Sequence, residues 1–135
     1  MAHLASPASP VAQPPRIRRV VRSFGYAFEG LGVMLKTQPN FLVHTAAGIV
    51  ALGLGFLLGL SPPELALIVL TIAIVMVVEC VNTALESLSD LVSPDFHPLI
   101  KRAKDISAAA VLIGAIASVV VAVLLFGPHV AAMLK

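Results

Sequence analysis

Four polar side chains follow a long apolar run at helical spacing, and their types make them the first candidates for chemistry. Glu79 comes first, and Asn82, Glu86 and Asp90 follow it along the chain. At 100° per residue, these three positions lie within about 60° of Glu79 around a helix. A helix over this region therefore presents a carboxylate, a carboxamide and two more carboxylates on one face.

The expected depth of Glu79 in the bilayer indicates that its function differs from that of Glu86. About 14 helical residues lie between Glu79 and the preceding turn, which is roughly 21 Å at 1.5 Å per residue. Glu79 then lies at the inner margin of a bilayer core, where an ionisable group is expensive and by default functional. We expect Glu79 to act on a lipid headgroup and Glu86 to hold a hard cation such as Mg²⁺, which prefers oxygen ligands. The alternative for Glu79 is a structural carboxylate bonded to a neighbouring helix.

Other polar residues stand at the ends of apolar runs on the same side. Lys104 and Asp105 immediately precede the run 106–126, and Gln38 precedes the run 41–60. His97 lies in the proline-bounded segment 93–98, where it either touches a nucleotide or is simply solvated.

Two further observations concern a histidine in the first apolar run and the motifs of known nucleotide-binding sites. His44, inside the first apolar run, is interpreted as a polar group bonded between helices. The sequence has no P-loop, no glycine-rich kinase loop and no HExxH motif. If the protein handles ATP, it does so by an unrelated design.

The composition requires lipid around much of the chain. Of its 135 residues, 59% are hydrophobic and 12% are charged, whereas soluble domains carry about 25% charged residues. A bilayer core of about 30 Å needs about 20 helical residues, and the sequence predicts three such spans, at 41–60, 62–88 and 104–126. We expect an all-α membrane protein with three transmembrane helices.

The first two spans are joined by a short turn with a recognisable helix start. Ser61 is expected to cap the second helix, Pro62 to occupy its first position, and Glu64 to complete a capping box. The two spans therefore form a helical hairpin.

Basic residues are distributed unequally between the two sides of these spans. Eight of the nine Lys and Arg residues precede the first span or lie between the second and third, and the ninth is Lys135. By the positive-inside rule, the N-terminus is cytoplasmic and the C-terminus lies outside.

An amphipathic helix is predicted over residues 17–36, before the first span. Its apolar stripe consists of Ile17, Val20, Val21, Phe24, Phe28, Leu31 and Leu35. Its opposite face carries Arg19, Arg22, Tyr26 and Glu29. Such a helix lies in the membrane interface, with its basic face toward headgroups or a phosphate-bearing ligand; a plain membrane anchor is the alternative.

Residues 1–15 differ from the rest in composition. They contain four prolines and small residues without charge, which is typical of a disordered tail. They lack the basic and apolar regions of a signal peptide. The domain is therefore expected to occupy residues 16–135.

Several segments resemble one family of membrane enzymes. Residues 79–86 (ECVNTALE) resemble the E-x-x-N-[TS]-A-x-E signature of the prokaryotic diacylglycerol kinases and undecaprenol kinases. Residues 102–105 (RAKD), followed by 108–112 (AAAVL), resemble a second block of that family. Residues 93–99 resemble the loop between the two blocks, and residues 23–31 resemble the family's surface helix. The similarity extends over about residues 16–126.

The resemblance implies an activity and an assembly. Members of this family are small homotrimeric lipid kinases of the bacterial inner membrane, with composite active sites at the cytoplasmic interface. They use ATP and Mg²⁺ to phosphorylate a membrane lipid alcohol. The expected partners are thus a lipid, ATP and two further copies of the chain, with no nucleic acid.

The resemblance also implies roles for individual residues. Glu79 takes the proton from the lipid hydroxyl, Glu86 binds the Mg²⁺ that bridges the ATP phosphates, and Asn82 positions phosphate or lipid. Phe41 is assigned to the lipid substrate. Lys104 and Asp105 are implied to contact the nucleotide. The residues implied to lie near the nucleotide or the lipid headgroup are Arg19, Tyr26 and His97.

One position departs from the family pattern. Many members carry a metal-binding glutamate before the first span, in a pattern like T-E-x-N-F, whereas residues 37–41 here read TQPNF. Gln38 offers a neutral carbonyl oxygen where a carboxylate is expected, which leaves it a candidate metal ligand of a weaker kind.

Two alternatives stay open at this point. The lipid is either undecaprenol or diacylglycerol, and the histidine-containing loop and the absence of Trp favour undecaprenol. A non-enzymatic membrane assembly or channel-type protein is the competing function. That alternative explains the spans and the basic helix but not the polar face that begins at Glu79.

Overall fold

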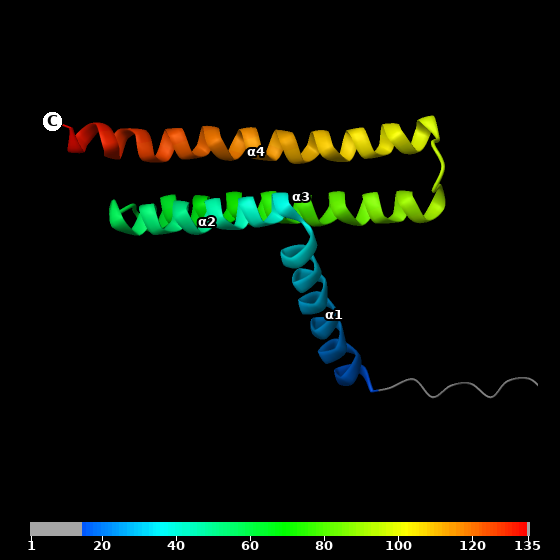
Figure 1. Cartoon of the computed structure of the whole chain (residues 1–135). Coiled ribbons are helices and arrows are strands. Elements are labelled where there is room, and N and C mark those ends of the chain that lie inside the picture. Colours follow the sequence, from blue (N-terminus) through cyan, green and yellow to red (C-terminus); the bar gives the residue numbers. More distant parts are fainter. Residues whose placement is uncertain (1–14, 135) are drawn as a thin grey trace, which may run out of the picture. The chain divides into compact units, whose positions relative to one another are not determined.

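The computed structural model describes residues 15–134, which form four helices and no strand. The helices are α1 (Arg16–Thr37), α2 (Pro39–Leu57), α3 (Pro62–Val92) and α4 (Pro98–Met133) (Figure 1). The predicted all-α class with three long apolar helices is therefore confirmed. The predicted disordered tail over residues 1–15 lies outside the described residues, apart from Pro15.

Three of the helices are long and apolar enough to cross a membrane. They are α2 with 19 residues, α3 with 31 and α4 with 36. At 1.5 Å per residue, α3 and α4 are roughly 46 and 54 Å long, more than a hydrocarbon core of about 30 Å requires. Both helices therefore project beyond the core.

The last helix is longer than the span expected at 104–126. It begins at Pro98 and continues past Pro128, which lies inside the helix, to Met133. Residues 101–105 (KRAKD) bring charge but are mostly good helix formers, so the helix persists where it leaves the apolar region.

Contacts divide the chain into two units, one ending at Val33 and the other beginning at Met34. Within the second unit, α3 packs against both α2 and α4 (Figure 1). In this unit α2 and α3 run antiparallel, and so do α3 and α4, as expected for helices joined by short connections. The central helix α3 therefore carries most of the helix packing.

The buried residues of α2 recur at intervals of seven. They are Phe41, Gly48 and Gly55. A Cβ atom added at Gly48 would lie 3.2 Å from Ile72, and one at Gly55 would lie 2.9 Å from Leu65 Cδ2. A seven-residue repeat with small residues is typical of helices that cross at a shallow angle with close backbones.

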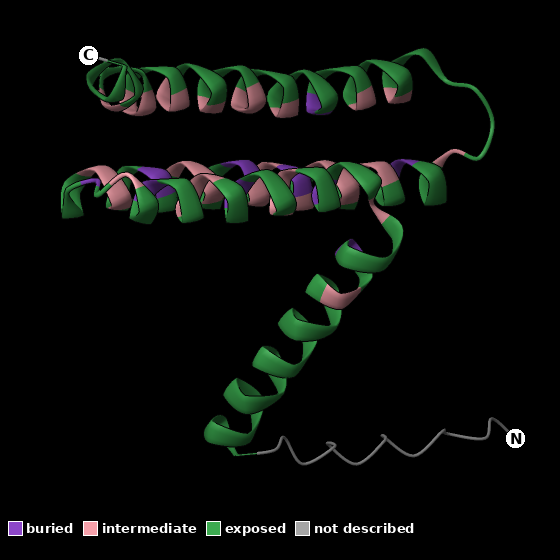
Figure 2. Ribbon diagram, turned by 60° about the vertical axis from the view of Figure 1, so that its left-hand side comes forward, coloured by how far each residue is buried: buried purple, intermediate pink, exposed green. Residues whose placement is uncertain are grey.

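The packing face of α3 repeats every seven residues at four positions and also includes Glu79, and we call it the α3 seam. Its members are Ile68, Val75, Glu79, Asn82 and Ser89, of which Asn82 is half-buried and the others are buried. Figure 2 shows buried positions recurring along one side of this helix pair. The seam is aliphatic in its first half and polar from Glu79 onward, so the polar face predicted from the sequence continues the face that packs the helices.

The predicted turn between α2 and α3 is confirmed. The Glu64 carboxylate accepts a hydrogen bond from the backbone N–H of Ser61 at 2.7 Å and another from the Ser61 hydroxyl. Pro62 is the first residue of α3, where no backbone donor is needed. Gly59 has a positive φ of 68°, which a glycine adopts without strain.

Replacing Gly55 with valine is expected to lower stability more than the same change at Gly53. The added atoms at position 55 meet Leu65 and Ile68, whereas nothing lies within 4 Å of the Cβ position at Gly53. Overpacking of this kind costs about 1–3 kcal/mol. Thermal unfolding followed by circular dichroism in one detergent compares the two variants; equal losses would show that the α2–α3 contact is not close.

Candidate active site

The carboxylate of Glu79 is held inside the helix packing. Its side chain is only 3% exposed, and Nε2 of His44 on α2 lies 3.2 Å from its Oε1. This distance is within the range of an ion pair, but the two groups are not aligned as a hydrogen bond. The sequence interpretation of His44 as an interhelical polar group is thus confirmed, and Glu79 is the partner.

Two buried side-chain oxygens have no hydrogen-bond donor. Within residues 15–134, the buried side-chain polar atoms without a partner are Oε1 of Glu79 and Oδ1 of Asn82. Buried polar atoms are nearly always bonded, and an exception in a folded protein calls for an explanation. Both exceptions lie on the α3 seam, one turn apart, so the unsatisfied acceptors are concentrated at the polar end of the helix packing.

Glu86 continues this face one turn beyond Asn82. Nδ2 of Asn82 donates a hydrogen bond of 3.2 Å to Oε1 of Glu86, whose side chain is half-buried. The contact fixes the orientation of the Asn82 amide, so that its oxygen is the atom left without a partner. The predicted row of Glu79, Asn82 and Glu86 therefore lies on one helix face.

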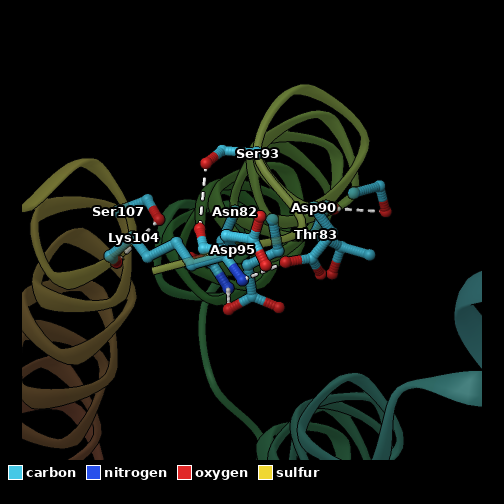
Figure 3. Close-up of polar contacts among 9 residues, drawn as sticks. Asn82, Thr83, Asp90, Ser93, Asp95, Lys104 and Ser107 are labelled. Carbon is cyan, nitrogen blue, oxygen red and sulfur yellow. Dashed lines mark hydrogen bonds and ion pairs between the residues drawn. The ribbon is translucent and has the colours of Figure 1, made fainter. Parts of the chain in front are cut away.

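Charged residues join α3 to α4 beyond this row (Figure 3). Lys104 reaches from α4 and forms an ion pair with Asp90 of α3. Asp105 pairs with Lys101 one turn away on its own helix. The two residues expected to meet a nucleotide are therefore already engaged with neighbouring charges, and both pairs are accessible to water.

The segment between α3 and α4 is organised by local bonds. The Ser93 hydroxyl donates to the backbone oxygen of Asp95 at 2.9 Å (Figure 3). Nδ1 of His97 accepts a hydrogen bond of 3.3 Å from the backbone N–H of Leu99, which caps the start of α4. His97 thus has a structural task; its expected contact with a nucleotide stays a prediction.

The residues that begin α2 include two more candidates. Gln38 is the residue before the helix, and its amide donates to the Thr37 hydroxyl at 3.4 Å. Phe41 is 2% exposed and is the largest fully buried side chain among the described residues. Phe41 therefore packs inside the protein, and its assignment to the lipid stays a prediction, as does the metal role of Gln38.

No dedicated metal cage is present within residues 15–134, because no three His, Cys, Asp or Glu side chains are grouped to hold an ion. Mg²⁺ does not require such a cage, since it usually keeps several waters and binds one or two carboxylates together with substrate phosphates. The half-buried Glu86 carboxylate and the unpartnered Asn82 oxygen are oxygen donors on one face. The residues present fit a magnesium ion that arrives with a nucleotide.

The first helix carries the remaining candidates in its own unit. Nη2 of Arg22 donates a hydrogen bond of 3.1 Å to the Tyr26 hydroxyl, and the guanidinium lies 6.0 Å from the centre of the ring. Ser23 donates to the backbone oxygen of Arg19 at 3.0 Å. Tyr26 and Arg22 share one face, as predicted, and the nucleotide contacts of Arg19 and Tyr26 stay predictions.

A cavity of about 200 Å³ lies among α2, α3 and α4. Its lining is apolar apart from His44, Thr71 and Ser118. His44 therefore has the Glu79 carboxylate in contact on one side and an apolar cavity beside it.

Sequence reasoning passed over His44 as a site residue, although one signal was available. It is the single ionisable side chain in the run 41–60, and it lies near the end of that run from which the basic residues extend. Glu79 lies at the corresponding end of the next span. Two ionisable groups at similar depth in adjacent antiparallel helices are candidates for a contact.

Comparisons with known proteins agree with this geometry. A family model described as prokaryotic diacylglycerol kinase matches residues 25–126. A diacylglycerol kinase of Synechocystis sp. is 45% identical over 100 residues, which cover 73% of this chain and 57% of that protein. An undecaprenol kinase of Bacillus subtilis is 38% identical over 112 residues, covering 83% of this chain and 91% of that protein.

A further relative extends the match at lower identity. A diacylglycerol kinase of Escherichia coli is 30% identical over 111 residues, covering 82% of this chain and 91% of that protein. The matched region contains the whole polar row of α3 and the charged start of α4. With most of its length matched by the family model and by these relatives, the chain belongs to the prokaryotic diacylglycerol kinase family.

Proposed function

We propose that this protein transfers the γ-phosphate of ATP to the hydroxyl group of a membrane lipid alcohol at the cytoplasmic face of a bacterial inner membrane. The observation that carries this proposal is the buried Glu79 carboxylate on the α3 seam, one turn from a buried Asn82 oxygen that has no hydrogen-bond partner. At the depth expected from the sequence, these two side chains would lie at the margin of the hydrocarbon, where the hydroxyl group of a lipid is found. The names of the relatives, which are lipid kinases, support the same reaction.

Glu79 acts as the general base of this reaction. Its carboxylate takes the proton of the lipid hydroxyl while that oxygen bonds to the γ-phosphorus and the bond from phosphorus to the leaving oxygen of ADP breaks. Phosphoryl transfer depends mostly on positioning and on neutralising charge. A base at the margin of the bilayer meets a lipid alcohol at its natural depth and keeps competing water scarce.

Glu86 is the residue that holds Mg²⁺, with Asn82 beside it. When bound, the ion neutralises the phosphate oxygens of ATP. Glu86 stands two turns from Glu79, or roughly 10 Å along the axis, on the side where ATP arrives from the cytosol. Asn82, between the two carboxylates, positions phosphate or lipid through its unpartnered oxygen.

The nucleotide is expected to replace the present ion-pair partners of charged residues on α4. Lys104 and Asp105 are held by Asp90 and Lys101 in exposed ion pairs, and such pairs contribute little to stability. A phosphate can therefore recruit Lys104 without a large loss. The other proposed nucleotide or headgroup contacts are Arg19, Tyr26 and His97.

The chain is proposed to function as a homotrimer with its N-terminus in the cytoplasm. Three helices cover the one-sided polar face poorly, and α4 carries small residues suited to close packing, namely Ala108, Ala109, Ala110, Gly114, Ala115 and Ala117. An active, monodisperse monomer in mild detergent would contradict the assembly.

The experiment that tests the function uses purified protein, radiolabelled ATP and Mg²⁺ in mixed micelles. Undecaprenol and diacylglycerol are supplied separately, and transfer of label to the lipid is measured. Transfer to either lipid supports the kinase, and the ratio of the two kcat/KM values identifies the substrate. No transfer to either lipid would favour a non-enzymatic membrane protein.

Changing Gln38 to glutamate is expected to lower the Mg²⁺ concentration needed for half-maximal activity. The wild type supplies one carboxylate, Glu86, so it should need more free Mg²⁺ than a variant with two acidic ligands. Titration of Mg²⁺ at fixed, saturating ATP compares the two proteins. Coinciding curves, or a higher requirement in the variant, would show that position 38 is not at the metal.

A further inference from the structure

We propose that His44 is a positioning residue for Glu79, an inference that rests on the proposed kinase function. The imidazole on α2 holds Oε1 of the carboxylate, so that the other oxygen, Oε2, is the one that meets the lipid hydroxyl. His44 touches no substrate itself and acts through the base.

The Glu79 carboxylate has the His44 ring against one of its two oxygens. Oε1 is buried and lies 3.2 Å from Nε2 of His44. Within residues 15–134, no other polar side chain makes a hydrogen bond or ion pair with this oxygen. Because the His44 ring occupies the space beside Oε1, we assign proton transfer from the lipid to Oε2.

The contact between His44 and Glu79 lacks the geometry of a hydrogen bond. A buried ion pair held only for stability needs good geometry, since desolvation otherwise outweighs the attraction. Here the ring nitrogen is within reach but not aligned. Catalytic hydrogen bonds are often loose before substrate binds and tighten in the reacting complex. A carboxylate that turns slightly toward a lipid hydroxyl would bring Oε1 into line with Nε2–H.

The imidazole of His44 has free space beside it. His44 lines the apolar cavity among the three helices, and its side chain is 22% exposed, against 3% for Glu79. The ring can therefore adjust to follow the carboxylate, while the carboxylate itself has no access to bulk water. This is the arrangement of a residue that orients a base and shields one of its oxygens.

The test compares two replacements of similar length, His44→Met and His44→Gln. Methionine fills the position without a donor, whereas glutamine keeps an amide N–H that can reach Oε1. We expect His44→Met to lower kcat by about 10- to 100-fold, the scale found when a partner that orients a functional side chain is removed. The KM values for ATP and lipid should stay near those of the wild type. We expect His44→Gln to keep most of the activity.

Two further measurements separate positioning from a structural role. In the background of Glu79→Gln, His44→Met should not lower the residual rate further, because the group through which it acts is gone. Thr45→Val serves as control: the Thr45 hydroxyl contacts the backbone of Phe41 and the sulfur of Met76, so this variant disturbs the same helix pair beside the site. Its kcat should match the wild type.

Several outcomes would overturn the inference in an active enzyme. They are a His44→Met kcat near the wild-type value, a His44→Gln rate as low as that of methionine, and an undiminished effect of His44→Met in the Glu79→Gln background. If His44→Met does not fold, the ring ¹⁵N resonances of His44 are compared between the wild type and Glu79→Gln, and unchanged resonances would overturn the contact. A wild type without lipid kinase activity would instead refute the proposed function and, with it, this role.

Discussion

Replacing Glu79 with glutamine is expected to remove nearly all lipid phosphorylation and to leave the protein folded. The amide has the size of the carboxylate but cannot take the proton of a lipid hydroxyl, and loss of a general base lowers the rate by about 10²–10⁴-fold. The fold should persist because the amide still occupies the α3 seam and can bond to His44. Initial rates at saturating ATP and lipid measure the effect, and gel filtration with thermal unfolding measures the fold.

The matched control is Glu64→Gln, the same substitution near the opposite end of the same helix. The Glu64 carboxylate caps α3 through Ser61 and takes no part in the proposed chemistry. The Glu64→Gln variant should have a slightly lower melting temperature and an unchanged kcat. Near-normal turnover in Glu79→Gln, with an intact assembly, would show that Glu79 is a structural carboxylate.

Replacing Glu86 with glutamine is expected to produce the second large loss. Glu86 is the one carboxylate on the α3 face that is half-buried beside an unpartnered amide oxygen. Without its charge, the phosphates of the transition state lose an electrostatic partner, and loss of one such group typically lowers kcat by about 10²–10³-fold. Raising the Mg²⁺ concentration should recover part of the activity.

The control for Glu86→Gln is the variant Asp90→Asn. It removes the same charge from the same helix one turn further on, but Asp90 is exposed and occupied by Lys104. Mg²⁺ titrations of both variants should show a much larger shift for Glu86→Gln. Equal shifts would mean that general negative charge along α3, and not a ligand at position 86, sets the requirement for the ion.

Features governed by local chemistry were predictable from the sequence. The capping box at Ser61 and Glu64 depends on residues three apart, and the structure contains it. The shared face of Glu79, Asn82 and Glu86 follows from helix geometry alone, and the hydrogen bond between Asn82 and Glu86 agrees with it. Apolar length predicted three long helices for the same reason.

Contacts between helices were harder to predict from the sequence. The His44–Glu79 contact depends on the rotation and axial offset of α2 against α3, which are set by Gly48, Gly55 and their neighbours on α3. No single segment contains that information. The pairing of Lys104 with Asp90 likewise depends on how the connection at 93–97 returns the chain. In addition, a hydrophobic pattern identifies only the apolar part of a helix. The span expected at 104–126 therefore omitted the first residues of α4, which begins at Pro98 and includes charged side chains.

The continuity of the α3 seam has a consequence for changes in chain length. One residue inserted between Val75 and Glu79 would turn every later position by about 100°, so the carboxylates would leave the packed face while the first half of the helix stayed in place. Seven inserted residues would restore the direction to within about 20°. They would also carry Glu79 roughly 10 Å along the axis, away from the depth of a lipid hydroxyl. Because direction and depth are set by the same stretch of helix, an insertion or deletion here cannot preserve both of them.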